Sequence, residues 1–288
     1  MPETASAPSL FMYSPGEYLR YRVLGQGSHT VILLHGFAAS LHTWDDIVPF
    51  FPPDEYALHL LDLKGHGGSS KRPEGDYSAL QNARIVTEFI RSRRLTDITV
   101  IGHSFGGAVA LLTALDCPDV RRLILIGAPG FPQQVPPFMR ILGLPLIGPL
   151  LMNVIPAETI ARSALKRAFY RHESITDRLV KRYAIGYHCK DTSRALSRTV
   201  RHILPANATQ LAAGYARLFI PVLLLWGERD KIVKPWQGEW LRKELPHSRL
   251  VIIPACGHNP HEEYPQETFA TIREFLATCD VDNRGHTC

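Results

Sequence analysis

Short, uninterrupted apolar runs recur along the chain and alternate with segments of helical periodicity. Residues 30–34 and 98–101 carry no charged side chain, as expected for strands buried on both faces of a parallel sheet. Residues 78–94 instead repeat apolar side chains at helical spacing. Strands that alternate with helices predict an α/β fold with a mostly parallel central sheet flanked by helices. Further strands are expected at residues 18–24, 59–63, 123–126, 222–226 and 250–253, and further helices at residues 107–115, 235–245 and 266–277.

The alternation of strand and helix stops between residues 131 and 215. This segment is rich in proline at first and then shows helical patterns with Arg at residues 157–170 and 177–185, without a strong strand signal. An all-helical insertion between two strands of a parallel sheet predicts a cap over the sheet. We therefore expect a core of residues 1–130 and 216–288, and a helical cap of residues 131–215.

Length and composition are those of a protein with a large buried core. The chain has 288 residues, of which 45% are hydrophobic and 20% charged, enough for one large domain with an inserted subdomain. The formal net charge is +5, but Lys and Arg are spread out, without a basic stripe that includes aromatic residues. Nucleic-acid binding is therefore not expected, and no pattern indicates an oligomeric state.

The sequence indicates neither a membrane anchor nor an oxidised compartment. The longest apolar stretch, residues 141–155, is interrupted by Gly and Pro and is too short to cross a bilayer. Its prolines also argue against a clean amphipathic helix on a lipid surface. Residues 1–8 lack the basic and apolar regions of a signal peptide, and the five cysteines contain no CxxC pair. We expect a cytoplasmic protein without a metal site.

The strongest chemical signal is the sequence Gly-His-Ser-Phe-Gly at residues 102–106, which matches the pattern G-x-S-x-G. In that motif the serine lies on a strained turn between a strand and a helix, and the glycines make room for it. An apolar strand precedes the motif here, and a helix follows it. The start of that helix supplies backbone N–H groups and a positive dipole end to a developing oxyanion. Ser104 is therefore the predicted nucleophile.

A serine nucleophile needs a general base and an acid that orients the base. With a serine elbow the partners follow along the chain in the order serine, acid, histidine. Asp230 and His258 come just after the strands expected at residues 222–226 and 250–253, and ligands collect at such strand ends in α/β sheets. Asp230 is therefore the predicted acid and His258 the predicted base. The rival residues are Glu228 for the acid, and His247 and His261 for the base.

These motifs, in this order, resemble the α/β-hydrolase superfamily over nearly the whole chain. Besides the serine elbow they include His-Gly-Phe at residues 35–37 and Asp-x-x-Gly-His-Gly-x-Ser at residues 62–69. The Asp230 loop and Gly-His at residues 257–258 complete the set. The resemblance implies an α/β-hydrolase fold.

Further roles follow from this resemblance. It implies that the backbone N–H groups of Phe37 and Phe105 form the oxyanion hole, because Phe105 follows Ser104 directly and Phe37 follows the His-Gly pair. The expected contribution of Phe37 to catalysis is its backbone N–H, and its aromatic ring is expected only to form part of the pocket wall. His35 and Asp62 are interpreted as residues that brace loops rather than as catalysts, and no cofactor is expected.

Serine at position 104 narrows the reaction. Proteins that resemble haloalkane dehalogenases or epoxide hydrolases have a carboxylate there, so we expect acyl transfer through an acyl-enzyme on Ser104. The run Gly-His-Asn-Pro-His-Glu at residues 257–262 is more similar to carboxylesterases and monoacylglycerol-lipase-like members. Hydrolases of meta-cleavage products often have Asn before the serine and Trp after the histidine, unlike this chain. The favoured function is therefore hydrolysis of a carboxylic ester with an apolar acyl or aryl group.

Three alternatives stay open. The first is a C–C bond hydrolase of the meta-cleavage-product type, and the second is a cofactor-free perhydrolase, which shares the same triad. The third belongs to another class, a small-molecule receptor on the same fold, because fold does not dictate function and a receptor can keep the triad. Turnover of a generic ester would separate catalysis from binding.

The cap is expected to determine which substrate is accepted. Apolar side chains near its start either line an acyl pocket or pack the cap onto the core, and the pattern does not decide between the two. The predicted substrate-binding residues are Phe131, Phe138 and Met139, with Pro136, Pro137, Ile141 and Leu142 as further candidates.

Overall fold

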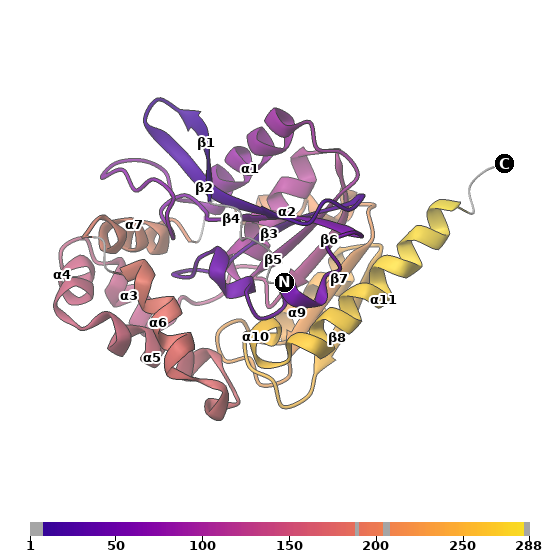
Figure 1. Cartoon of the computed structure of the whole chain (residues 1–288). Helices are drawn as coiled ribbons and strands as arrows, with labels where there is room; N and C mark the ends of the chain where they lie inside the picture. Colours follow the sequence, from indigo (N-terminus) through magenta and orange to yellow (C-terminus); the bar gives the residue numbers. More distant parts are fainter. Residues whose placement is uncertain (1–7, 188–189, 204–207, 285–288) are drawn as a thin grey trace.

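The computed structural model describes residues 8–187, 190–203 and 208–284. The expectation that the chain starts without a signal peptide concerns residues 1–8, and all but the last of these lie outside the described ranges. Within the described ranges, the chain folds into a layered core and a helical cap (Figure 1).

The centre of the molecule is a mixed sheet, which contains eight strands in the described part of the chain. The strands are β1 (Ser9–Ser14), β2 (Glu17–Leu24), β3 (His29–Leu34), β4 (Tyr56–Leu61), β5 (Ile98–His103), β6 (Val120–Ile126), β7 (Val222–Gly227) and β8 (Ser248–Ile253). Their order across the sheet is β1-β2-β4-β3-β5-β6-β7-β8. The pairs β1–β2 and β2–β4 are antiparallel, and the other neighbouring pairs are parallel. The predicted mostly parallel sheet is confirmed.

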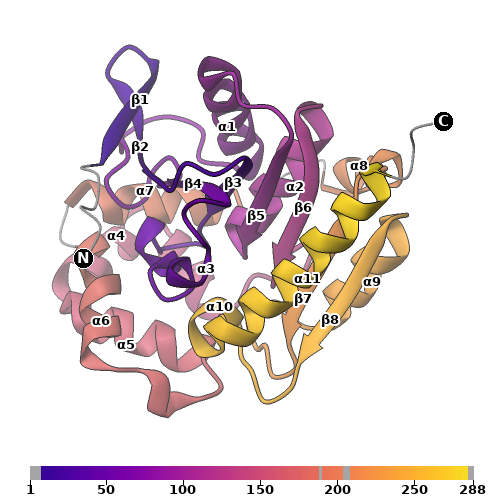
Figure 2. The same cartoon turned by 45° about the vertical axis from the view of Figure 1, so that its right-hand side comes forward.

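Helices cover both faces of this sheet (Figures 1 and 2). Successive strand residues point to opposite faces, so Ile32 packs into one hydrophobic cluster and Leu33 into the other. The helices on the Ile32 face are α1 (Ala79–Arg93), α2 (Phe105–Asp116) and α9 (Trp236–Glu244). The Leu33 face is covered by the 3₁₀ helices η1 (Leu41–Trp44) and η2 (Val48–Phe50) and by α11 (Pro265–Arg284), which follows the short α10 (Pro260–Glu263).

Helix α1 begins and ends where the sequence predicts. Ser78 caps its first turn, because the Ser78 side chain accepts a hydrogen bond from the backbone N–H of Gln81. Arg94 ends the helix in the left-handed conformation, with φ 51°, and its N–H returns to the carbonyl groups of the last turn. The prediction of a helix over residues 78–94 is therefore confirmed, with the two end residues as caps.

Two strands differ from the expectation. The strand expected at residues 59–63 is β4, which starts earlier and ends at Leu61, because the N–H of Leu63 leaves the sheet and donates to the ring of His35. Strand β1 was not predicted. It lies at the edge of the sheet and leaves Leu10 and Met12 exposed, so its sequence lacks a continuous buried run.

A helical insertion between β6 and β7 forms the cap, as expected. Figure 1 shows its helices α3 to α7 gathered on one side of the sheet. A separate small core joins α5 to α6 through Leu165 and Val180. The elements of the insertion are α3 (Pro137–Gly143), α4 (Ile147–Val154), α5 (Ala157–Ala168), η3 (His172–Ser174), α6 (Asp177–Ala184), η4 (Ile185–Tyr187), α7 (Lys190–Arg201), α8 (Ala208–Ala212) and η5 (Tyr215–Arg217).

The C-terminal end of the insertion packs on the core. Ala212 and Tyr215 belong to the hydrophobic cluster on the α1 and α2 face of the sheet rather than to the small core of the cap. The division of the chain at residues 131 and 215 stays a prediction.

Candidate active site

Ser104 forms the turn between β5 and α2. Its backbone is left-handed, with φ 52° and ψ −120°, a conformation that costs a non-glycine residue about 1–3 kcal/mol. The glycine two residues later is required by close packing, since a Cβ on Gly106 would lie 2.3 Å from the carbonyl oxygen of Leu34. The strand, the strained turn and the helix are therefore arranged as the G-x-S-x-G pattern predicts.

Asp230 and His258 meet at the ends of two neighbouring strands, β7 and β8. The Nδ1 atom of His258 lies 2.7 Å from Oδ2 of Asp230, and both side chains are buried. The other carboxylate oxygen of Asp230 accepts the N–H groups of Ile232 and Val233, at 2.8 and 2.9 Å. With a carboxylate as its acceptor, Nδ1 carries the proton, and Nε2 is left as the basic nitrogen.

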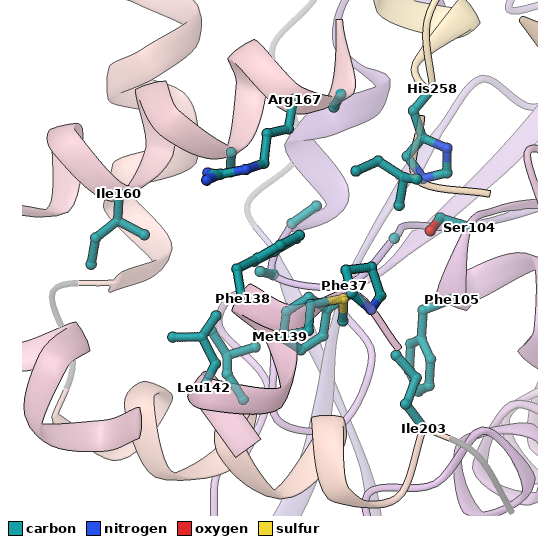
Figure 3. A pocket seen from close by; sticks show the side chains of 18 of the residues that line it. Phe37, Ser104, Phe105, Phe138, Met139, Leu142, Ile160, Arg167, Ile203 and His258 are labelled. Carbon is teal, nitrogen blue, oxygen red and sulfur yellow. The ribbon is translucent and has the colours of Figure 1, made fainter. Parts of the chain in front are cut away.

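Ser104 and His258 line the same cavity. Figure 3 shows the Ser104 hydroxyl and the His258 imidazole together at one end of it. The backbone N–H of His258 donates to the carbonyl of Ala168 at the end of α5, at 2.6 Å, so the loop that carries this histidine is attached to the cap. The three residues predicted from strand ends are thus brought to one place.

The rival residues point elsewhere. Glu228 is half exposed, accepts the N–H of Ala255 and pairs with Arg229 on the surface. The ring of His247 lies beside that of Phe219. His261 is buried, but its Nε2 lies 3.0 Å from the hydroxyl of Thr43. None of the three is paired as His258 is with Asp230.

The predicted oxyanion-hole residues flank the serine. Phe105 is the first residue of α2, and the first N–H groups of a helix have no acceptor within the helix. On the other side, a Cβ on Gly36 would lie 3.2 Å from the Cβ of Ser104, which places the loop before Phe37 against the serine. Phe37 and Phe105 both line the cavity (Figure 3). The role of their N–H groups stays a prediction.

His35 and Asp62 make the contacts expected of loop braces. His35 accepts the N–H of Leu63 through Nε2, at 3.0 Å, and burial lowers the pKa of His35. Asp62 accepts the N–H groups of Leu41 and Gly68, each at 2.7 Å. Neither side chain lines the cavity that holds Ser104.

His103 is a site residue that the sequence reasoning missed. Its Nε2 lies 2.9 Å from the backbone carbonyl oxygen of His258, and the two rings are 4.7 Å apart. Burial, with His261 and His258 nearby, lowers the pKa of His103 well below its usual value, so the ring is neutral and donates from Nε2. His103 therefore holds the backbone of the proposed base in place. The only sequence signal for this role was the position of His103 in the elbow, directly before Ser104.

A cluster of buried polar side chains lies behind His258. Tyr183 of α6 donates its hydroxyl to Glu262 at 2.7 Å, and Asn259 donates to the same carboxylate at 2.6 Å. Burial raises the pKa of Glu262, although Arg182 opposes this effect. Tyr183 and Asn259 also line the cavity. The sequence alone could not find this cluster, because it joins a cap helix to a distant loop.

The three neighbouring histidines of the site are not arranged as metal ligands. The ring nitrogens described above for His103, His258 and His261 bind a carbonyl, a carboxylate and a hydroxyl. Burial, with the charges of His258 and Arg182, lowers the pKa of His261 to about 3. Among the residues that the structure describes, no three His, Cys, Asp or Glu side chains are grouped to hold a metal ion.

The cavity above Ser104 has a volume of about 470 Å³ and a mostly apolar wall. The cap supplies much of this wall (Figure 3), and all three predicted substrate-binding residues, Phe131, Phe138 and Met139, lie in it. Pro137 is exposed and does not line the cavity. The sequence reasoning did not name the contributions of α5 and α7, whose apolar members include Ile160, Ala164, Leu165 and Leu196.

Comparison with known proteins finds relatives that cover most of the chain. The pimeloyl-[acyl-carrier protein] methyl ester esterase of Nitrosomonas europaea is 28% identical over 253 residues, which are 82% of this chain and 91% of that protein. Lipase 3 of a Moraxella species is 26% identical over 257 residues, 85% of this chain and 76% of that protein. An esterase from Thermogutta terrifontis shares the fold, with a TM-score of 0.78 and 23% identity over 95% of this chain and 99% of that one. The model described as "Alpha/beta hydrolase family" matches residues 31–271, so this chain belongs to the alpha/beta hydrolase family.

Proposed function

We propose that this chain is a serine hydrolase that cleaves carboxylic esters through an acyl-enzyme on Ser104. One observation carries the proposal. A serine held in a strained elbow shares an apolar cavity with a histidine whose far nitrogen lies 2.7 Å from a buried carboxylate. That combination supplies a nucleophile, a base and the group that orients the base.

The reaction follows from these positions. Ser104 attacks the ester carbonyl carbon while Nε2 of His258 takes the hydroxyl proton, and Asp230 stabilises the imidazolium that forms. The N–H groups of Phe37 and Phe105 hold the oxyanion. The tetrahedral intermediate then collapses, the C–O bond to the alcohol breaks, and His258 returns the proton to the leaving alcohol. Water, deprotonated by His258, then attacks the acyl-enzyme, the bond to Ser104 breaks, and His258 returns the proton to the Ser104 oxygen as the carboxylic acid leaves.

The choice of an ester rests on the cavity and on the relatives. An apolar wall suits an apolar acyl or aryl group, because burial of such a group contributes roughly 25 cal/mol per Å². Two relatives, the pimeloyl-[acyl-carrier protein] methyl ester esterase and Lipase 3, carry names of ester-cleaving enzymes. Both lines of support favour an ester with an apolar acyl part.

Covalent labelling tests the nucleophile. A fluorophosphonate probe should modify the wild-type protein at Ser104, as read by peptide mass spectrometry, and Ser104→Ala should stay unlabelled. Ser163 provides the matched control, because it lines the same cavity and its hydroxyl is bound by Arg167 instead. Ser163→Ala should label as fast as wild type. Labelling at Ser163 in the wild type would overturn the assignment.

A substrate panel tests the reaction. The wild-type protein should turn over 4-nitrophenyl esters in many cycles, and faster than dienone acids of the meta-cleavage type. Faster cleavage of a dienone acid would instead show C–C bond hydrolysis. A single labelling cycle with tight product binding and no turnover would indicate a receptor.

A further inference from the structure

The outer face of the cap is strongly apolar. Helix α4 and the turn before it expose Leu146, Leu150 and Val154 by 85%, 62% and 71%. Because these residues are four positions apart, they lie along one side of the helix. Neighbouring exposed side chains extend the surface, which we call the α3–α4 face: Ile141, Leu144, Ile147 and Ile155.

Helix α4 is apolar on its inner side as well. Met152 is buried in the cap, and Leu151 lines the cavity above Ser104. A surface helix normally carries polar residues along the side that faces water. In α4 the only polar side chain is that of Asn153. Contiguous exposed apolar surface of this kind marks an interaction site.

The charged side chains beside α3 are positive, and the nearest acidic residue along the chain is Glu158, three residues after Ile155. Between residues 131 and 157 the sequence has no Asp or Glu, and Arg140 is the only charged residue. Helix α7 packs against α3 and α4. It brings Arg201 close to α3, since a Cβ on Gly143 would lie 3.7 Å from Cγ of Arg201. Arg140 and Arg201 are both exposed, so cationic groups flank the apolar surface.

The positive charge belongs to the whole cap. Residues 131–215 contain 12 Lys and Arg and 4 Asp and Glu, a net charge of 12 − 4 = +8. The rest of the chain contains 20 Lys and Arg and 23 Asp and Glu, a net charge of 20 − 23 = −3. A partner that covers the α3–α4 face must therefore be apolar where it meets the leucines and anionic around them.

The shape of the α3–α4 face suits binding to a surface rather than insertion across a bilayer. Over the described ranges no single helix has the length and apolar character needed to span a bilayer. Helices α3 and α4 reach that length and apolar character only together, and they bend by 101° relative to each other. Helix α4 has eight residues and is therefore about 12 Å long. An apolar face of this size with cationic flanks fits the interface of an anionic lipid layer.

We propose that the α3–α4 face docks on the surface of an anionic lipid bilayer, with Leu146, Leu150 and Val154 inserted among the acyl chains and Arg140 and Arg201 against the lipid headgroups. Figure 1 shows α4 at the outer edge of the cap, away from the sheet. Ile141 belongs to this face and also lines the cavity above Ser104, as does Leu151 on the inner side of α4. Docking itself does not depend on the proposed ester chemistry.

Vesicle binding tests the proposal without turnover. Full-length Ser104→Ala protein is mixed with phosphatidylcholine vesicles that contain either no phosphatidylglycerol or 30–40%, and the bound fraction is measured by co-sedimentation. We expect binding to the anionic vesicles. The double change Leu146→Gln and Leu150→Gln should lower the partition coefficient about tenfold or more, because two buried leucine side chains are lost.

The matched control is Phe219→Gln. Phe219 is 69% exposed but precedes β7, at the opposite end of that strand from Asp230. The Phe219→Gln variant should bind vesicles as the parent protein does. The melting temperature of every variant should be unchanged, since the substituted side chains face solvent. Equal binding by the leucine variant and the control, or no binding by any of them, would overturn the proposal.

Charge and self-association are tested separately. Arg140→Gln and Arg201→Gln should each weaken binding to the anionic vesicles about fivefold and leave binding to neutral vesicles unchanged. Sedimentation velocity without lipid tests whether a second copy of the chain binds the α3–α4 face instead, because a dimer would sediment faster than the monomer. A dimer that the leucine changes dissociate, together with absent vesicle binding, would assign the α3–α4 face to self-association and overturn lipid docking.

Discussion

The guanidinium group of Arg182 lies 2.9 Å from the carboxylate of Glu262, and this ion pair joins cap helix α6 to the segment just after His258. Arg182 also holds Asp46 of the core, with its Nη1 at 3.0 Å from Oδ1 of the carboxylate. Glu262 is fully buried and Arg182 nearly so. Hydrogen bonds and charges from Asp46 and Glu262 raise the pKa of Arg182 in spite of its burial.

The buried pair should matter for stability. Arg182→Met leaves the carboxylate of Glu262 buried without its counter-charge, so the free energy of unfolding should fall by about 3–5 kcal/mol, as measured in urea. Arg162→Met is the control, because Arg162 pairs with Asp177 on the exposed surface of the same cap and should cost less than about 1 kcal/mol. Equal losses in the two variants would show that the Arg182 pair contributes no more than a surface pair.

The strained backbone of Ser104 predicts opposite effects on activity and stability. Ser104→Gly and Ser104→Ala should each reduce kcat by a factor on the order of a million. Only glycine adopts φ 52° and ψ −120° without strain, so Ser104→Gly should raise the free energy of unfolding by about 1 kcal/mol, after its own entropic cost. Ser104→Ala should leave it unchanged. Equal stabilities of the two variants in urea would contradict the link between strain and function.

The carboxylate of Asp230 should be required for turnover. Asp230→Asn keeps the size of the side chain but no longer fixes the Nδ1 proton of His258, so kcat should fall by about ten-thousand-fold. Glu228→Gln should have a small effect, because Glu228 pairs with Arg229 at the surface. Steady-state kinetics with a 4-nitrophenyl ester measures both. A larger loss for Glu228→Gln would show that Glu228 is the acid.

Buried histidines should make the fold sensitive to acid. Burial lowers the pKa of His66 and of His261 to about 3 from the ordinary value of 6.5. Between these pH values the unfolded chain binds more protons than the folded chain, so the free energy of unfolding decreases as the pH falls from about 6.5 toward 3. Each such histidine contributes a slope of up to about 1.4 kcal/mol per pH unit. The raised pKa of Glu262 acts in the opposite direction above its ordinary pKa.

Removing one of these histidines should change the slope. His261→Asn should reduce the dependence of the unfolding free energy on pH between 6 and 5 by about one proton, whatever it does to stability at pH 7. Urea denaturation at several pH values gives this slope. A slope equal to that of the wild type would mean that His261 does not have a lowered pKa in the folded protein.

Much of the site could be predicted from the sequence because its signals are local. Ser104, Asp230 and His258 each lie within a few residues of the end of an apolar strand, and parallel strands end at the same edge of a sheet. The bounds of helix α1 could be predicted because its capping residues, Ser78 and Arg94, are adjacent to it in the sequence. The wall of the cavity was predicted in part, since Phe138 and Met139 lie in it, but which apolar residues of the cap face inward depends on how its helices pack.

Contacts between distant segments could not be predicted. His103 and His258 are 155 residues apart and meet only because β5 and β8 belong to one sheet. The pairing of Arg182 with Glu262 depends on how the cap sits on the core. No single described helix is long and apolar enough to span a bilayer, but the prolines of residues 141–155 obscured helix α4 and the end of α3. The spacing of Leu146, Leu150 and Val154 places them on one side of α4, but whether that side is exposed depends on how the cap packs.

The length of the acyl chain should determine the rate until the cavity is full. Each methylene buried against the wall contributes up to about 0.8 kcal/mol, so kcat/KM for 4-nitrophenyl esters should rise by up to roughly fourfold per methylene from acetate through butyrate. Beyond the chain length that the closed cavity holds, toward octanoate, the values should level off or fall. A steady fall from acetate onward would indicate a small or polar acyl site.

Met139 should limit that length. Its side chain is buried in the cavity wall, so Met139→Ala enlarges the cavity and should move the maximum of kcat/KM to longer esters. Phe138→Ala should act in the same direction, although the ring of Phe138 also packs under Arg167, whose guanidinium lies 5.0 Å from its centre. Leu144→Ala is the control, because Leu144 follows the same helix but does not line the cavity. If Leu144→Ala shifted the maximum as far as Met139→Ala does, packing of the cap rather than direct contact would set the acyl length.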